Sequence, residues 1–286
     1  MLVYMFPGQG SQFKGMGQEL LELFPKEAAE ASKILGYDIK ELCLNDHNNF
    51  LVETEYTQPA IYFISCLSFL RETNHRKNNI PNFICGHSLG EYAALFASGA
   101  FDLFTGLEIV KKRGNLMGSI KNGGMLAVIG KDVLKVKSIM EESGITEIDV
   151  ANYNTFEQIA LSGIKEEIMK IKVILEEKGF KCILLNVSAA FHSRFMEPIR
   201  IDFMRYLTQF DFSEPKIHII SSTTGLIMEK NYILENLGFQ LVRSVNWVNT
   251  ILYLKELSVL SYIELEPGKV LTNLTTKILN AGKEIT

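Results

Sequence analysis

A strand, a tight turn and a helix follow one another directly between Phe83 and Phe96. The apolar run Phe83-Ile84-Cys85 is typical of a buried strand, and Gly86-His87-Ser88-Leu89-Gly90 follows it without a linker. The two glycines permit a sharp turn that lifts the serine hydroxyl away from the backbone, and apolar residues then continue as a helix. This G-x-S-x-G pattern predicts that Ser88 is a nucleophile at the end of a sheet, in a fold of the α/β class.

Apolar, strand-like segments alternate with helical segments along most of the chain, which also predicts an α/β fold. Residues 2–6 form a short apolar run that ends in Pro7-Gly8-Gln9-Gly10, the pattern of a buried strand leading into a loop. Between Met125 and Val187 the predicted order is βαββαβ, that of a ferredoxin-like unit. We therefore expect a large α/β-hydrolase-like domain, residues 1–124 and 188–286, with a ferredoxin-like small subdomain inserted at residues 125–187.

Helices and strands outside this insert are predicted from periodicity and from turn residues. A helix is expected from Thr57 to about Arg71, followed by a loop over residues 72–79. Beyond Val187 the predicted elements are a helix at 195–209, a strand at 216–221, a helix at 247–257, a strand at 262–265 and a terminal amphipathic helix.

Composition excludes several classes of protein. The chain has 286 residues and is 47% hydrophobic, which is enough for a continuous core. Its net charge of −4 gives no basic excess that would attract nucleic acid. No apolar run approaches the roughly 20 residues that span a bilayer, so we expect no membrane association and a cytoplasmic location. The cysteines, widely spaced at 43, 66, 85 and 182, are expected to be reduced core thiols rather than metal ligands.

A serine hydroxyl needs a base, so the five histidines were compared as candidates. His47, His75 and His218 have no companion motif, and surface or core roles are favoured for them. His87 adjoins Ser88, but neighbours on a sharp turn point apart, which favours a packing or orienting role. His192 follows a predicted strand and precedes a helix, which places it on a loop at a sheet end. We therefore predict His192 as the base.

Six short motifs give the chain a family resemblance. The motifs are FPGQGSQ beginning at Phe6, YTQPA at Tyr56, GHSLGE at Gly86, KRG at Lys112, AFHS at Ala190 and EPGKVL at Glu266. They resemble those of malonyl-CoA:acyl carrier protein transacylases and occur in the same order. The resemblance covers nearly the whole chain. The segments GHSLGEYAALFASGAFD and SAAFHSRFM look most like the discrete, trans-acting acyltransferases that serve modular polyketide synthases.

The resemblance implies a role for each matching residue of the reaction centre. Ser88 would be acylated in a ping-pong cycle, with His192 taking its proton and returning it to the leaving thiol. The family orients this histidine through a backbone carbonyl just before a tryptophan, which points to Asn246. The oxyanion would be held by the backbone N–H groups of Gln9 and Leu89.

Substrate contacts follow from the same resemblance. Arg113 would hold the free carboxylate of a malonyl group, since a guanidinium grips a carboxylate with two hydrogen bonds. Without the motif, Arg113 would be interpreted as a surface charge on a helix. Gln58 and Asn152 would be supporting contacts. Phe191 is bulky where acyltransferases that take methylmalonyl usually carry a smaller residue, so malonyl is favoured.

The predicted function is therefore transfer of malonyl from malonyl-CoA to the phosphopantetheine thiol of an acyl carrier protein. The resemblance implies no bound cofactor and no metal, and we expect a monomer. Lys178, Lys181 and Arg194 are candidates for docking an acidic carrier near the mouth of the site. Two alternatives stay open: an acyl hydrolase that clears carrier proteins with the same serine and histidine, and a non-catalytic carrier-binding scaffold.

Overall fold

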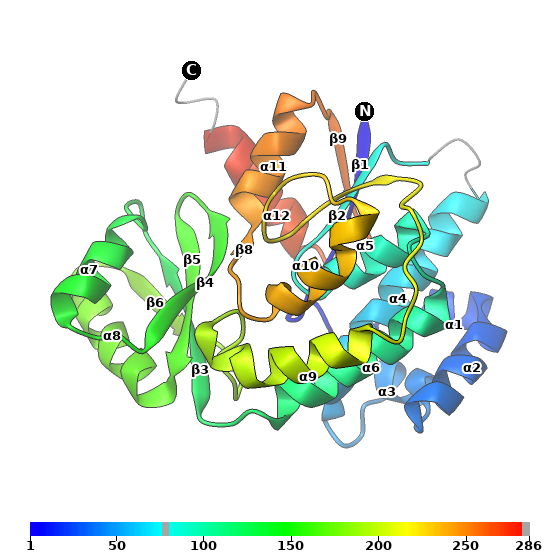
Figure 1. The fold of residues 1–286 in the computed structure, drawn as a ribbon, viewed down its shortest axis with the longest axis horizontal. Helices are drawn as coiled ribbons and strands as arrows, with labels where there is room; N and C mark the ends of the chain where they lie inside the picture. The colour runs from blue at the N-terminus through cyan, green and yellow to red at the C-terminus, as the bar shows by residue number, and fades with distance from the viewer. Residues whose placement is uncertain (76–79, 282–286) are drawn as a thin grey trace.

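Two β-sheets organise the chain in the computed structural model, which describes residues 1–75 and 80–281 (Figure 1). The first sheet is parallel, and its strand order is β7 (His218–Ile220), β2 (Phe83–Gly86), β1 (Leu2–Phe6) and β9 (Ser261–Glu264). Its central strands β1 and β2 are almost entirely apolar because helices cover both of their faces. We call this sheet and its helices the large lobe.

Alternate residues of β1 pack into two separate cores. Tyr4 and Phe6 face the larger core, and Val3 and Met5 face the smaller one, as the two-residue period of a strand requires. The helices of the large lobe are α1 (Gln18–Leu23), α2 (Pro25–Leu35), α3 (Ile39–Leu44), α4 (Thr54–His75), α5 (Gly90–Ser98), α6 (Leu103–Ser119), α9 (Glu197–Leu207), α10 (Ile233–Gln240), α11 (Trp247–Glu256) and α12 (Val270–Ala281). Short 3-10 turns lie at Phe50–Val52, Arg194–Met196 and Lys230–Tyr232.

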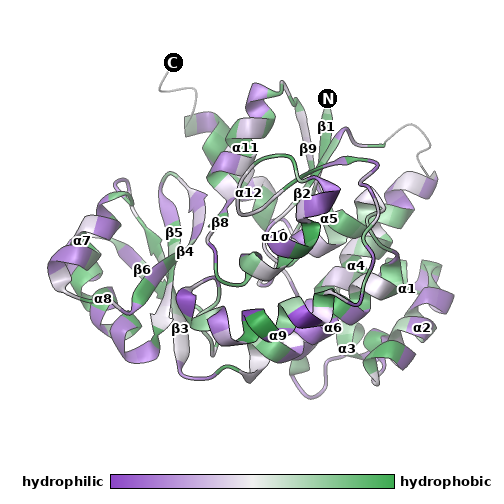
Figure 2. Cartoon of the chain, in the orientation of Figure 1, coloured by the Kyte–Doolittle hydropathy of each residue, from purple (hydrophilic) through white to green (hydrophobic). Residues whose placement is uncertain are grey.

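The second sheet forms a small lobe, which lies to the left in Figure 1. Its strand order is β6 (Lys181–Leu184), β3 (Gly123–Ile129), β5 (Gln158–Ile164), β4 (Ile148–Thr155) and β8 (Val245–Asn246). Adjacent strands among the first four are antiparallel, whereas β8 pairs in parallel with β4. Helices α7 (Lys135–Ser143) and α8 (Lys165–Glu177) pack on this sheet through a third core, and their polar residues colour them largely purple in Figure 2.

Most predicted elements lie where the sequence placed them, and the differences have physical reasons. Helix α4 begins at Thr54 and continues to His75, so the predicted loop begins later than Glu72. Residues 76–79 of that loop lie outside the described residues. Helix α10 was not predicted, and β8 ties the small sheet to a segment assigned to the large domain.

Three further features bear on function. None of the helices in the described part of the chain is long and apolar enough to cross a membrane. All four cysteines are free. Cys43, Cys66 and Cys85 are buried, as predicted for core thiols, whereas Cys182 is only partly buried. Within residues 1–75 and 80–281, no three side chains of the His, Cys, Asp or Glu type gather as a metal site requires.

Candidate active site

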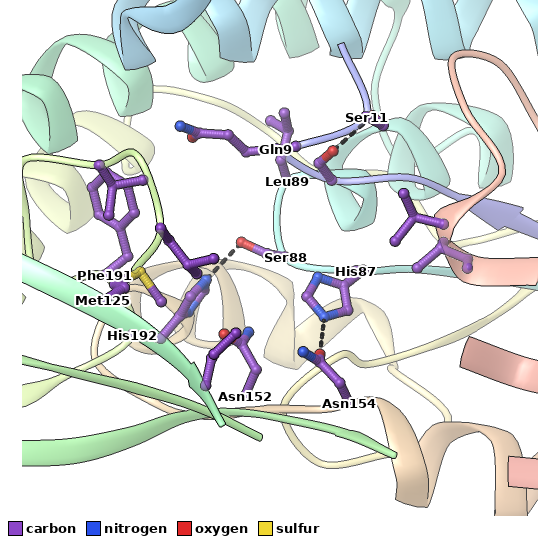
Figure 3. A pocket seen from close by; sticks show the side chains of 18 of the residues that line it. Gln9, Ser11, His87, Ser88, Leu89, Met125, Asn152, Asn154, Phe191 and His192 are labelled. Carbon is purple, nitrogen blue, oxygen red and sulfur yellow. Dashed lines mark hydrogen bonds between the residues drawn. The ribbon is translucent and has the colours of Figure 1, made fainter. Parts of the chain in front are cut away.

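Ser88 lies on the turn between β2 and α5, at the carboxyl end of the parallel sheet. Its φ of 52° is in the left-handed region, which few non-glycine residues adopt. A Cβ on Gly86 would lie 2.0 Å from the main-chain carbon of Gly90, and a Cβ on Gly90 would lie 2.0 Å from the main-chain oxygen of Phe6. Both flanking positions therefore require glycine, and the serine side chain points toward His192 (Figure 3).

His192 stands opposite the serine, on the loop between β6 and α9. The Ser88 Oγ and His192 Nε2 atoms are 2.7 Å apart, and His192 Nδ1 lies 2.8 Å from the main-chain oxygen of Gln240. A carbonyl only accepts hydrogen bonds, so Nδ1 carries the proton of the neutral ring. Nε2 then has a free lone pair, and the serine hydroxyl donates to it. This arrangement is that of a nucleophile held against its general base.

The pKa of His192 favours the neutral ring. Burial and, after it, the positive charge of Arg113 lower this pKa from 6.5 to about 3, although the hydrogen bond to the Gln240 carbonyl opposes the shift. The imidazole is therefore unprotonated at neutral pH and able to accept the serine proton.

The carbonyl that orients His192 belongs to Gln240, so the prediction of Asn246 was wrong. The main-chain oxygen of Asn246 accepts instead from Thr250 Oγ1 at 3.1 Å, inside helix α11. Its side chain caps the same helix by accepting from the N–H of Asn249 at 3.2 Å. The unpredicted helix α10 ends at Gln240 and brings that carbonyl to the histidine.

Arg113 on α6 is buried beside the serine, with an exposed fraction of 1%. Its Nη1 donates to Gln58 Oε1 at 2.8 Å, and its Nη2 donates to Ser88 Oγ at 3.2 Å and to Gln240 Oε1 at 3.0 Å. All three acceptors are neutral, and among the described residues its Nε has no hydrogen-bond acceptor. A buried cation with donor capacity to spare is suited to an anionic ligand.

Gln240 joins the parts of the site and was missed in the sequence. Its Nε2 donates to the main-chain oxygen of Ser88 at 3.1 Å and also to the carboxylate of Glu91. The side chains of Gln240 and Glu91 are both fully buried. The one sequence signal for Gln240 is a polar residue within the apolar run Leu237–Val242, where burial would require partners.

The two main-chain N–H groups that were predicted to hold an oxyanion belong to residues that line the same cavity as Ser88. Leu89 lies at the N-terminus of α5, and Gln9 lies on the loop after β1. The Gln9 side chain is engaged separately, donating from Nε2 to Thr54 Oγ1 at 3.3 Å. Within the described chain no acceptor is recorded for either main-chain N–H, as expected of donors reserved for a ligand.

A cavity of about 280 Å³ encloses these groups between the two lobes. Ser88, His192 and Arg113 line it together with the predicted residues Gln9, Leu89, Gln58, Asn152 and Phe191. Its apolar wall is formed by side chains from both lobes: Met117, Met125, Ala127 and Ala160. His87 points away from His192 and lies 3.0 Å, Nε2 to Oδ1, from Asn154 of β4, so it orients the turn, as the sequence suggested (Figure 3).

Comparison with known proteins agrees with this geometry. A family model described as an acyl transferase domain matches residues 3–283. The polyketide biosynthesis malonyl CoA-acyl carrier protein transacylase PksC of Bacillus subtilis is 42% identical over 280 residues, with 97% of each chain covered. The malonyl CoA-acyl carrier protein transacylase of Burkholderia pseudomallei superposes with a TM-score of 0.95 at 36% identity, with 98% of each chain covered.

Another similar structure contains a partner. It is a type II polyketide synthase acyl-carrier protein in complex with its malonyl-transacylase, which matches at a TM-score of 0.91 and 30% identity over 98% of this chain and 93% of that one. Some relatives are much longer: the chain spans 24% and 37% of the length of two polyketide biosynthesis proteins, ThaF of Burkholderia thailandensis and PksE of Bacillus subtilis.

Proposed function

Because the chain belongs to the acyl transferase domain family, we propose that it moves a malonyl group from malonyl-CoA to the phosphopantetheine thiol of an acyl carrier protein in polyketide biosynthesis. The observation that carries this proposal is the buried Arg113 beside Ser88, which has only neutral hydrogen-bond acceptors. Cytoplasmic residence and a monomeric state stay predictions.

The first half of the reaction acylates the serine. Ser88 Oγ attacks the thioester carbonyl of malonyl-CoA while its proton passes to His192 Nε2, and the main-chain N–H groups of Gln9 and Leu89 bind the oxyanion. The carbon–sulfur bond then breaks, and the leaving CoA thiolate takes the proton from His192. In the second half the carrier thiol gives its proton to His192 and attacks the Ser88 ester. The bond between Ser88 Oγ and the malonyl carbonyl carbon breaks, the serine oxygen takes the proton back from His192, and the carrier leaves with the malonyl group.

Substrate selection rests on four further residues that line the cavity. Arg113 pairs with the malonyl carboxylate, and Gln58 holds the guanidinium through Oε1. Phe191 is bulky and buried, which favours malonyl over a branched acyl group. Asn152 contributes a polar contact from β4.

The two lobes support the predicted division into a large domain and an inserted subdomain. Residues 1–124 and 188–286 would form the α/β-hydrolase-like domain, supported by the parallel sheet and the serine turn. Residues 125–187 would form the ferredoxin-like subdomain, supported by the βαββαβ order and the strand order β6-β3-β5-β4. The cavity between them would admit the pantetheine arm.

An acyl hydrolase is the alternative that uses the same serine and histidine. It is disfavoured because a carboxylate-binding arginine has no role in removing neutral acyl groups. Replacing Arg113 by Ala should lower kcat/KM for malonyl-CoA. The expected loss of transition-state stabilisation is roughly 2–5 kcal/mol, because the malonyl carboxylate is then unpaired in a buried site.

The experiment compares malonyl-CoA with acetyl-CoA, and a carrier thiol with water as acceptor, for the wild type and for Arg113→Ala. The proposal expects the wild type to prefer malonyl and the carrier, and the variant to lose malonyl activity while acetyl transfer changes little. A wild type that prefers acetyl groups, or that transfers to water faster than to the carrier, would establish the hydrolase instead.

A further inference from the structure

Glu91 is a buried carboxylate that the proposed reaction does not use. It lies in the first turn of α5 with no exposed surface, and burial raises its pKa. Three donors besides Gln240 hold it: the N–H of Ser222 at 2.9 Å, the hydroxyl of Ser222 at 2.9 Å and Asn236 Nδ2 at 3.2 Å. So many donors on one buried group favour its ionised, acceptor-only form.

The fourth donor connects Glu91 to the site. Gln240 gives its Nε2 to Glu91 and its Oε1 to Arg113 Nη2. An amide has one accepting end and one donating end. An ionised Glu91 can only accept, so it fixes the NH₂ end of Gln240 on its own side and turns the oxygen toward the guanidinium.

We propose that Glu91 is a positioning residue for malonyl selectivity: it sets the orientation of the Gln240 amide, which in turn holds Arg113 in place for the substrate carboxylate. This inference rests on the proposed malonyl transfer and adds to it the residue that fixes the arginine.

Substitution by Gln predicts a specific rearrangement. A Gln at position 91 that keeps its oxygen on the N–H of Ser222 must present its NH₂ group to Gln240, so the Gln240 amide rotates to avoid two facing donors. Its NH₂ end would then face Arg113, and the guanidinium would lose one acceptor and its fixed orientation.

The test measures kcat/KM for malonyl-CoA and acetyl-CoA, because His192 and the oxyanion donors act on both and cancel in the ratio. Glu91→Gln should lower the malonyl-to-acetyl ratio roughly 10- to 100-fold, as expected when a hydrogen bond to a charged group is lost. Glu264→Gln is the matched control. It removes a carboxylate that accepts from the N–H groups of Leu271 and Thr272, and should change stability without changing the ratio.

A double-mutant comparison tells positioning through Gln240 from a merely structural role. Gln240→Met keeps the main-chain oxygen that His192 needs and removes the amide. This single substitution should therefore lower the malonyl-to-acetyl ratio. In that background Glu91→Gln should have no further effect. If Glu91→Gln lowers both substrates equally, or lowers the ratio equally with and without the amide, the inference is wrong.

The pH profile gives a second readout that a structural role would not produce. The other titratable groups facing Glu91 are Cys85, Tyr92 and Arg113. Burial raises the pKa of the thiol and of the phenol, and the guanidinium keeps its charge, so none of them titrates between about pH 4 and 8. Glu91 loses its charge as the pH falls through its raised pKa. On acidification, the malonyl-to-acetyl ratio of the wild type should therefore begin to fall at a higher pH than the same ratio of Glu91→Gln.

Two other outcomes have defined meanings. If Glu91→Gln does not fold, Gln240→Met carries the test, and an unchanged ratio in that variant would overturn the inference. A wild type that takes no malonyl from malonyl-CoA would overturn the proposed function and this inference with it, whereas an unchanged ratio in the variants of a malonyl-transferring wild type would overturn the inference alone.

Discussion

Single residues of the site differ in how much the sequence says about them. Ser88 and His192 stand in local patterns of strand, loop and helix that carry their own physical meaning. Arg113 has no such pattern, and only the family resemblance predicted that it contacts the substrate. In the structure it lines the cavity and is 1% exposed. The resemblance predicted that the carbonyl of Asn246 orients His192, but the carbonyl of Gln240 does so. A main-chain oxygen leaves no signature in the choice of side chain, so the sequence could not reveal this.

The lowered pKa of His192 predicts an unusual acid limb for the reactivity of Ser88. Burial is the main cause that lowers the pKa of His192 from 6.5 to about 3. The imidazole therefore stays neutral, and able to accept the serine proton, at pH values well below 6.5. The rate of Ser88 modification by a neutral sulfonyl fluoride should therefore be nearly constant between about pH 7.5 and pH 5. Such a probe carries no carboxylate, so titration of Glu91 affects it little. A rate that halves near pH 6.5 would mean that His192 titrates as an exposed imidazole.

At the scale of elements, the strands were predicted more easily than the helix that completes the site. Strand β1 and the β2 turn have strong local signals, whereas α10 contains Gly238, which lowers helix propensity. The reason for this glycine is tertiary: a Cβ at position 238 would lie 2.4 Å from Met204 Cγ of α9. Close packing of two helices thus weakened the local signal of the one that carries Gln240.

The side-chain cap of helix α11 contributes to stability and can be tested apart from catalysis. Asn246→Ala removes the side-chain cap on the N–H of Asn249 and should lower the free energy of unfolding by about 1 kcal/mol. Since His192 bonds to Gln240 and not to this residue, kcat/KM should be unchanged. Denaturant unfolding and steady-state kinetics on the same preparation check both. A large fall in kcat/KM with an intact fold would mean that the Asn246 side chain acts on the site and does more than cap the helix.

For the whole molecule, the order of elements was predictable but the meeting of the lobes was not. The βαββαβ order of the small lobe follows from local periodicity. The pairing of β8 with β4 joins only two residues of each strand, across about ninety positions of sequence, and no local pattern encodes it. The cavity lies at this junction, so the set of residues around Ser88 could be proposed from the sequence only through the resemblance.

Carrier docking is a property of this larger surface, and one predicted contact needs correction. Arg194 is engaged by Asp149 through its guanidinium and its main-chain N–H, so it is not an open cation. Lys178 and Lys181 are exposed beside the apolar side chains of Ile183 and Leu184. Reversing both lysines to Glu should raise KM for an acidic carrier and weaken its salt dependence, while hydrolysis of malonyl-CoA stays constant.

Reversing the exposed Lys26 and Lys33 of the distant helix α2 to Glu is the matched control for that change in net charge (Figure 1). If the double reversal and the control have the same effect on KM, the carrier docks on another face of the molecule.

The central claim is that Ser88 carries the malonyl group between the two thiols. The direct measurement is mass spectrometry of the intact protein and of its peptides after incubation with malonyl-CoA, followed by addition of a carrier protein with its phosphopantetheine thiol. We predict one malonyl ester on the peptide that contains Ser88, its disappearance with simultaneous malonylation of the carrier, and no label on Ser88→Ala. A label on another residue, no label, or transfer to the carrier by Ser88→Ala would contradict the account.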